Sequence, residues 1–158
     1  MASREFTVRS ELAAPRERVW ERVSSVAGVN AELRPLARMT APPDVERFEP
    51  ETVPIGERLF RSWILLFGVL PIDYDDITLV RVEAGHGFLE RSPMLSQRRW
   101  EHERTLEDAG GGCRVTDRVR FEPRIGPLAP LLLGLFRAVF RHRHRRLRRE
   151  FGGRALGA

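Results

Sequence analysis

Residues 127–151, PLAPLLLGLFRAVFRHRHRRLRREF, form the longest stretch of the chain in which apolar side chains recur at helical spacing. These side chains return at steps of three and four residues, which places them on one face of a helix. They are Leu128, Leu132, Leu135, Phe136, Val139, Phe140, Leu147 and Phe151. Pro127 and Pro130 suit a first helical turn, and Gly152-Gly153 suits a helix end. We therefore predict a helix over residues 131–151, about 30 Å long at 1.5 Å per residue.

The two halves of this helix differ in character. The first half is apolar on nearly all sides, so we expect it to be buried on several sides. The second half carries many arginines, and most of its circumference should face water; these are Arg141, Arg143, Arg145, Arg146, Arg148 and Arg149. Such a helix needs a concave partner, which the strands before it would supply.

The chain upstream of this helix begins with one strand and two short helices. Residues 5–13 alternate apolar and charged side chains, which predicts a half-buried strand. A helix should follow Pro15 and stop at Gly28, and a second short helix is predicted over residues 31–36. The remaining strands are predicted at residues 45–49, 57–67, 73–83, 87–94, 98–107 and 113–122. This order predicts an α+β fold with a curved antiparallel sheet of about seven strands.

The bulk composition predicts one globular domain over residues 1–158. No run of 18 or more uncharged apolar residues is present, and the N-terminus lacks a signal-peptide core, so we predict a cytoplasmic protein. The lone Cys113 excludes an internal disulfide and any multi-cysteine metal site. No phosphate-binding loop, nucleophile elbow or dinucleotide fingerprint is found, and no cofactor is expected.

The positive charge of the chain is concentrated at one end of the last helix. The net charge is +5, a value that can indicate nucleic-acid or anionic-lipid partners. Residues 137–154 hold eight arginines and one glutamate, whereas the rest of the chain holds 19 basic and 21 acidic residues. Aromatic residues are not interleaved there as in single-strand binders, so we expect no nucleic-acid partner. We favour a solvated helix end, with a membrane surface as the less favoured interpretation.

The hairpin predicted over residues 98–122 carries polar side chains on its inner face. If its turn centres near residues 109–110, Trp100 faces Val119 and His102 faces Asp117. The opposite side carries charges of both signs and should be solvated. The inner face is therefore apolar except for three side chains, which need partners or a ligand: His102, Asp117 and Arg104.

Short motifs in this hairpin and in the last helix resemble those of a known superfamily. The hairpin contains Trp100-Glu101-His102-Glu103, then Gly111-Gly112 and Val115-Thr116-Asp117-Arg118-Val119. The helix region contains Gly126-Pro127-Leu128 and Phe140-Arg141-His142-Arg143. With the order of elements, these motifs resemble the START-like helix-grip superfamily, the SRPBCC proteins with their polyketide cyclase/dehydrase and lipid-transport relatives. The resemblance covers nearly the whole chain and is weakest over residues 37–57.

This resemblance implies a helix-grip fold, in which the sheet wraps around the last helix and encloses an elongated apolar cavity. Members of the superfamily bind hydrophobic small molecules, and some cyclise or dehydrate polyketides, so membership implies a pocket without fixing a chemistry. We predict the following residues as ligand contacts: Trp63, Tyr74, Trp100, His102, Asp117, Phe136 and Phe140.

The His102–Asp117 pair allows two interpretations. A carboxylate beside an imidazole fixes its tautomer and raises its pKa, as a general acid or base requires. Alternatively, the two side chains satisfy each other and order the sheet, which we favour over catalysis. No metal site is expected, because His142 and His144 are two residues apart and point to different helix faces. We expect His144 to form a contact between helix and sheet.

Three hypotheses for function follow. The first is binding of a hydrophobic or aromatic small molecule, lipid- or polyketide-like, under the last helix. The second is an enzyme of the cyclase, aromatase or dehydratase type, in which His102 moves protons. The third is a module that contacts a membrane surface or a protein through the arginine-rich helix end.

Overall fold

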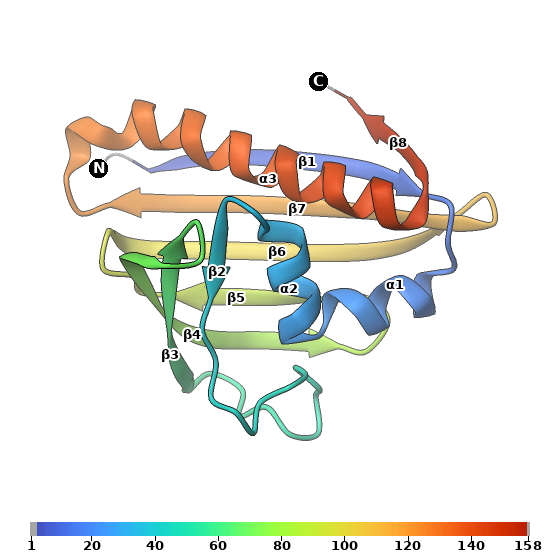
Figure 1. Cartoon of the computed structure of the whole chain (residues 1–158), viewed down its shortest axis with the longest axis horizontal. Coiled ribbons are helices and arrows are strands. Elements are labelled where there is room, and N and C mark those ends of the chain that lie inside the picture. The colour runs from blue at the N-terminus through green and yellow to red at the C-terminus, as the bar shows by residue number, and fades with distance from the viewer. Residues whose placement is uncertain (1–2, 158) are drawn as a thin grey trace.

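The computed structural model describes residues 3–157, in which eight strands form one antiparallel sheet (Figure 1). The strand order is β2-β3-β4-β5-β6-β7-β1-β8. The strands are β1 (Arg4–Leu12), β2 (Ala37–Met39), β3 (Arg58–Leu66), β4 (Leu70–Glu83), β5 (Gly87–Ser92), β6 (Gln97–Ala109), β7 (Gly112–Pro123) and β8 (Gly153–Leu156).

The helices lie on one face of this sheet, and the longest runs along β1 and β7 (Figure 1). They are α1 (Arg16–Val23), α2 (Val26–Leu33), the 3-10 turn η1 (Gly126–Leu128) and α3 (Ala129–Phe151). The predicted α+β architecture, with two short helices after the first strand and a long helix against the sheet, is confirmed. Among residues 3–157, no helix combines the length and the apolar composition needed to cross a membrane.

The boundary predicted between the first two helices is wrong. α1 ends at Val23 and α2 begins at Val26, and the Ser25 hydroxyl caps α2 by accepting a hydrogen bond from the Gly28 N–H at 2.9 Å. A Cβ atom on Gly28 would lie 1.7 Å from the carbonyl oxygen of Arg22. This glycine therefore allows the ends of the two helices to pack closely and does not stop a helix.

The predictions at the two edges of the sheet also need correction. The strand predicted over residues 45–49 is wrong, because only one isolated bridge forms there, between Arg47 and Ser25. The short edge strands β2 and β8 were not predicted. Gly152 does end α3, but the chain then returns along β1, and a Cβ on Gly153 would lie 1.9 Å from the Glu11 carbonyl oxygen.

The β6–β7 hairpin has the predicted inner face in a different register. Arg104 lies opposite Asp117, and His102 lies opposite Val119, because the turn is formed by Gly110-Gly111 with φ values of +54° and +89°. This differs by two residues from the predicted pairing. Side chains alternate with a period of two, so a shift of two keeps every residue on its predicted face. The polar inner face is confirmed.

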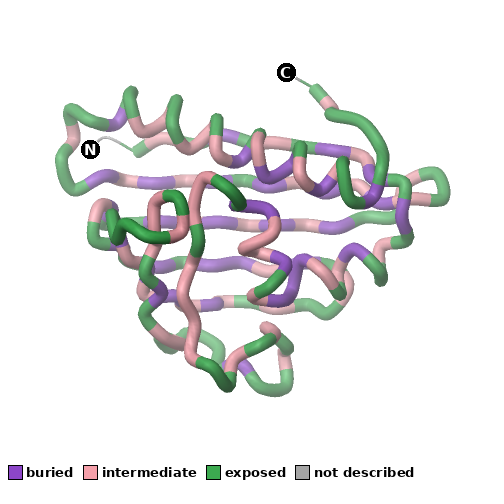
Figure 2. Tube along the Cα trace, in the orientation of Figure 1, coloured by how far each residue is buried: buried purple, intermediate pink, exposed green. Residues whose placement is uncertain are grey.

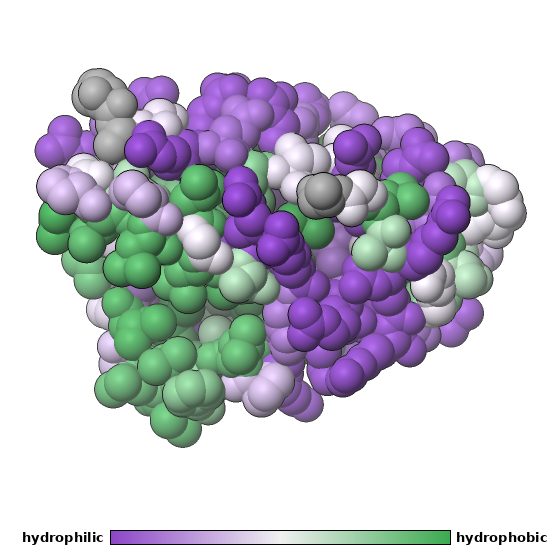
Figure 3. Space-filling view, turned by 90° about the horizontal axis from the view of Figure 1, so that it is seen from above, coloured by the Kyte–Doolittle hydropathy of each residue, from purple (hydrophilic) through white to green (hydrophobic). Residues whose placement is uncertain are grey.

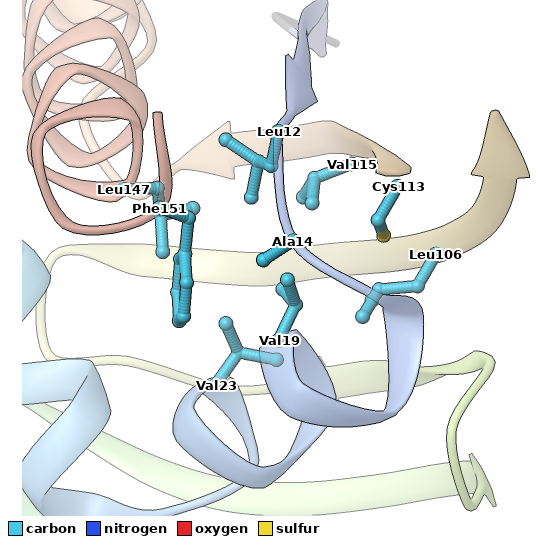
Figure 4. Close-up of a cluster of buried hydrophobic side chains, with 9 residues drawn as sticks. All are labelled: Leu12, Ala14, Val19, Val23, Leu106, Cys113, Val115, Leu147 and Phe151. Atoms are coloured by element: carbon cyan, nitrogen blue, oxygen red, sulfur yellow. The ribbon is translucent and has the colours of Figure 1, made fainter. Parts of the chain in front are cut away.

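Buried and exposed positions alternate along the long strands (Figure 2), and one apolar cluster packs under the end of α3 (Figure 4). The cluster joins α1, α3 and the strands β1, β6 and β7. Its members are Leu12, Ala14, Val19, Val23, Leu106, Cys113, Val115, Leu147 and Phe151. Burial raises the pKa of the Cys113 thiol to about 11, so this cysteine is an unreactive part of the core.

We expect Leu147→Ala to destabilise the protein by about 2–5 kcal/mol, because it opens a cavity in this cluster. Leu147 is 1% exposed, whereas Leu131, on the same helix, is 70% exposed. Leu131→Ala is therefore the matched control and should change the free energy of unfolding little. Urea denaturation measures both variants, and equal effects would contradict the assignment of the core.

Candidate functional site

A cavity of about 530 Å³ lies between the sheet and α3. This volume is within the range of about 300–1,000 Å³ typical of small-molecule sites. The wall on the helix side is the apolar stripe of the first part of α3: Leu132, Leu135, Phe136, Val139 and Phe140. A larger hollow of about 860 Å³ lies outside, between α1, α2 and residues 41–47, but its lining mixes charged and apolar groups. The apolar cavity between the sheet and α3 is the better candidate site.

Aromatic side chains form one wall of the cavity. Trp100 on β6 meets Phe136 edge-on, with ring centroids 5.1 Å apart, and lies 6.3 Å from the Phe140 ring. The His102 ring meets Phe140 edge-on at 4.9 Å. Four of the residues predicted from the sequence therefore come together at this wall.

The structure does not bring Trp63 and Tyr74 to the cavity. These residues pair across β3 and β4 with ring centroids 5.3 Å apart, and Trp63 is 41% exposed. The Arg61 guanidinium lies over the Tyr74 ring at 3.9 Å. Side chains alternate along a strand, and here the neighbours Ser62 and Asp75 point inward, so the two aromatic rings are on the outer face.

The mouth of the cavity lies between the β3–β4 turn and the start of α3. Three residues that line the cavity are also exposed there, namely Phe67, Ile72 and Leu135, at 67%, 52% and 53%. Figure 3 shows apolar side chains gathered at this end of the molecule and polar ones at the other. The sequence analysis did not predict this rim. Phe67 lies in a turn, with φ of +53°, and so belongs to no repeating pattern of apolar residues that would indicate its position.

A network of buried charges lies behind the cavity wall and is centred on Asp117. Arg104 donates to both oxygens of Asp117, from Nε to Oδ1 at 2.7 Å and from Nη2 to Oδ2 at 2.6 Å. The same guanidinium binds Glu32 of α2 with two bonds of 2.8 Å. Arg143 of α3 donates to Glu32 Oε1 at 3.1 Å. Two arginines and two carboxylates thus neutralise each other inside the protein.

Two histidines complete the contacts of Asp117. Its Oδ1 lies 2.7 Å from Nε2 of His102, and its Oδ2 lies 2.7 Å from Nε2 of His144. His144 also lies 2.9 Å from the Ser10 hydroxyl through Nδ1, and Arg148 donates to that hydroxyl at 2.8 Å. The expected contact between His144 and the sheet is therefore confirmed.

The charge of Asp117 follows from these neighbours. Burial alone would raise its pKa, but the positive charge of Arg104 and the hydrogen bonds from Arg104 and His102 hold the pKa well below its ordinary value. An ionised carboxylate only accepts hydrogen bonds, so His102 carries its proton on Nε2 and leaves Nδ1 as the nitrogen available to a ligand. Of the predicted pair, His102 lines the cavity and Asp117 lies behind it.

A second set of carboxyl groups lines the part of the cavity formed by β4 and β5, where Glu90 is the cross-strand partner of His102. Asp73 and Asp75 on β4 and Glu90 on β5 are all buried and all border the cavity. Only one pattern in the sequence could have indicated them. Side chains alternate along a strand, so Asp73 and Asp75 lie on the same face of β4 as the apolar Ile77. Among the described residues, no group of His, Cys, Asp and Glu has the arrangement needed to hold a metal ion.

We expect Asp117→Asn to lower the free energy of unfolding at pH 7 by about 3–5 kcal/mol, because Arg104 and Arg143 would share the single carboxylate of Glu32 and one buried positive charge would be uncompensated. The folded-state pKa of Asp117 is depressed, so its stabilising effect is present above the ordinary pKa and is lost as the pH falls through the folded value. The exposed Asp44→Asn is the control. Chemical denaturation between pH 2 and 7 should show a smaller pH dependence for Asp117→Asn than for the wild type, and equal profiles would contradict this role.

Comparisons with known proteins agree with this architecture. Residues 10–151 match the family described as Domain of unknown function (DUF8410). Among curated proteins, none has a matching sequence. The Zhui aromatase/cyclase from Streptomyces sp. R1128 superposes with a TM-score of 0.69 and 12% identity, over 94% of this chain and 93% of that one.

Two further solved structures have similar folds. Protein CV1439 from Chromobacterium violaceum has a TM-score of 0.68 and 12% identity, over 94% of this chain and 96% of that one. Ara h 8.0201 has a TM-score of 0.58 and 11% identity, over 92% and 97% of the two chains. At these identities the similarity shows the fold alone. The chain belongs to the DUF8410 family and has the helix-grip fold of the START-like (SRPBCC) superfamily.

Proposed function

We propose that this protein binds an apolar or aromatic small molecule, lipid- or polyketide-like, between the sheet and the first half of α3. The observation that carries the proposal is an apolar cavity of about 530 Å³ whose mouth is rimmed by exposed apolar side chains. Removing apolar ligand surface from water is favourable by roughly 25 cal/mol per Å². The fold similarity to a protein named as an aromatase/cyclase supports this use of the cavity.

The residues that line the cavity indicate how such a ligand would be held. Trp100, Phe136 and Phe140 would pack against its apolar body, because their rings already meet at one wall. His102 would orient a polar group through Nδ1, with Asp117 holding the ring in place from behind. Native mass spectrometry, followed by organic extraction, would identify a ligand that copurifies with the protein.

We expect Val139→Trp to weaken binding at least tenfold, because the larger side chain fills the cavity next to Phe140. Ala138→Trp is the matched control, since Ala138 is exposed on the outer side of the same helix. Titration with the apolar dye 8-anilinonaphthalene-1-sulfonate, monitored by fluorescence, measures the affinity of both variants. Undiminished dye binding by Val139→Trp would place the site elsewhere and refute the proposal.

A second candidate function is proton transfer to or from a bound substrate. It is favoured by the geometry of His102, which borders the cavity and has a carboxylate on its far nitrogen. We expect His102→Gln to bind the extracted ligand within about threefold of the wild type but to turn it over at least a hundredfold more slowly. Single-turnover assays, with product separated by chromatography, test this, and equal turnover would remove His102 from the chemistry.

The hypothesis of a membrane-binding or protein-binding module receives less support. Three arginines of the basic helix end form hydrogen bonds inside the protein: Arg143 with Glu32, Arg146 with the Ala31 carbonyl and Arg148 with Ser10. A smaller exposed group is left to attract an anionic surface. Its members are Arg141, Arg145 and Arg149.

A further inference from the structure

The cavity contains a pair of carboxyl groups that the buried charge network does not use. Asp75 is 3% exposed and Glu90 is 9% exposed, and both border the cavity. They occupy neighbouring strands, β4 and β5, whose inward side chains are otherwise mainly apolar. Buried acidic residues without basic partners are rare, because an isolated buried charge is strongly unfavourable.

The hydrogen bonds around this pair are incomplete. Glu90 Oε1 accepts a bond of 2.9 Å from the Ser92 hydroxyl, which itself accepts from the Thr78 N–H at 3.0 Å. The single proton of Ser92 is therefore already used. Asp75 Oδ1 is buried and has no hydrogen-bond partner among residues 3–157. An oxygen in this position calls for a donor that the protein itself does not provide.

Neither of the arginines that border the cavity pairs with Asp75 or Glu90. The two arginines that border the cavity, Arg104 and Arg143, are bound to Asp117 and Glu32. The third carboxyl group, Asp73, already accepts bonds from the backbone N–H groups of Tyr74 and Ser96 and from the Ser96 hydroxyl. The cavity wall at β4 and β5 is therefore acidic, whereas the wall at β6 and α3 is electrically balanced.

The protonation of the pair follows from its surroundings. Burial, and then the nearby Glu90, raise the pKa of Asp75 well above its ordinary value. The other titratable groups that face the cavity are Asp73, His102, Arg104 and Arg143. The surroundings of the empty cavity therefore favour the protonated form of Asp75.

We propose that Asp75 and Glu90 form a subsite for the protonated amino group of an otherwise apolar ligand. An ammonium group offers three donors and no acceptor, which fits a site made of carboxylate acceptors. It also supplies a positive charge beside Asp75 and Glu90, where neither lining arginine is bound. The ligand class is then a hydrophobic primary amine, with its aromatic or aliphatic body against Trp100 and Phe136. This inference rests on the proposed function, since it requires that the cavity bind a ligand.

Binding of such a ligand is linked to pH. A bound ammonium favours the ionised form of Asp75, so the proton that Asp75 carries in the empty cavity is released to solvent. Affinity should therefore rise as the pH increases, by up to tenfold per pH unit while the empty pair retains its proton. A neutral ligand of the same shape displaces no proton and should bind with little pH dependence.

Isothermal titration calorimetry with 2-(2-naphthyl)ethylamine and the isosteric 2-(2-naphthyl)ethanol tests this inference. At pH 8 we expect the amine to bind at least tenfold more tightly than the alcohol, with a smaller ratio at pH 6. Repeating the titration in buffers of different ionisation enthalpy gives the number of protons released on binding. The double variant Asp75→Asn/Glu90→Gln should lose the preference for the amine and keep the affinity for the alcohol.

Two single variants refine the test. Asp75→Asn removes the carboxyl group that carries the displaced proton and leaves Glu90 to face the ammonium, so amine binding should persist with no proton release. Asp76→Asn is the control on the outer face of the same strand, where Asp76 pairs with Arg61, and it should behave as the wild type. Equal affinities for amine and alcohol, or a double variant that still prefers the amine, would overturn the subsite while leaving the cavity as a binding site. If neither probe binds and the fluorescent dye does not bind either, the proposed function fails together with this inference.

Discussion

The buried carboxylate of Asp117 is the constraint on which the rest of the interior depends. It accepts hydrogen bonds from Arg104 and His102 on β6 and from His144 on α3. Through Arg104 the same network reaches Glu32 on α2. A single anion therefore sets the positions of the hairpin, the long helix and a short helix relative to one another. Because each charge is buried with its partner, none of these elements can move away without exposing an unpaired charge.

This anchoring divides the interior into a packed part and a hollow part. The second half of α3 is fixed by the network and by the core around Leu147 and Phe151. The first half has no comparable polar anchor, and its apolar face borders the cavity. The acidic pair on β4 and β5 lies where this hollow space is left.

The sequence predicted the features that depend on periodicity. The long helix follows from apolar spacings of three and four residues, and the last hairpin with its polar inner face follows from a spacing of two. The predicted pairing of β6 with β7 was wrong by two residues, but a shift of two leaves every side chain on its predicted face. The inward positions of Trp100, Phe136 and Phe140 were found in the same way. These regularities are local, so they are visible without knowledge of the fold.

Features that depend on contacts between distant segments were not predicted. Trp63 and Tyr74 resemble core residues by type, but the alternation of β3 and β4 turns their neighbours Ser62 and Asp75 inward and the two rings outward. Glu32 could not be assigned as the partner of Arg104, because the two residues are 72 positions apart in the sequence and no local spacing connects them. Asp75 is identified only because its Oδ1 has no donor nearby among residues 3–157, which no spacing encodes.

The short strands at the two ends of the sheet have a consequence for solubility. β2 has three residues and β8 has four, and they cover parts of the edges of β3 and β1. A long uncovered edge offers unpaired backbone groups on which another chain can add a strand. β8 forms only because Gly152 and Gly153 let the chain double back closely along β1. These two glycines therefore protect the protein from self-association at an edge far from its cavity.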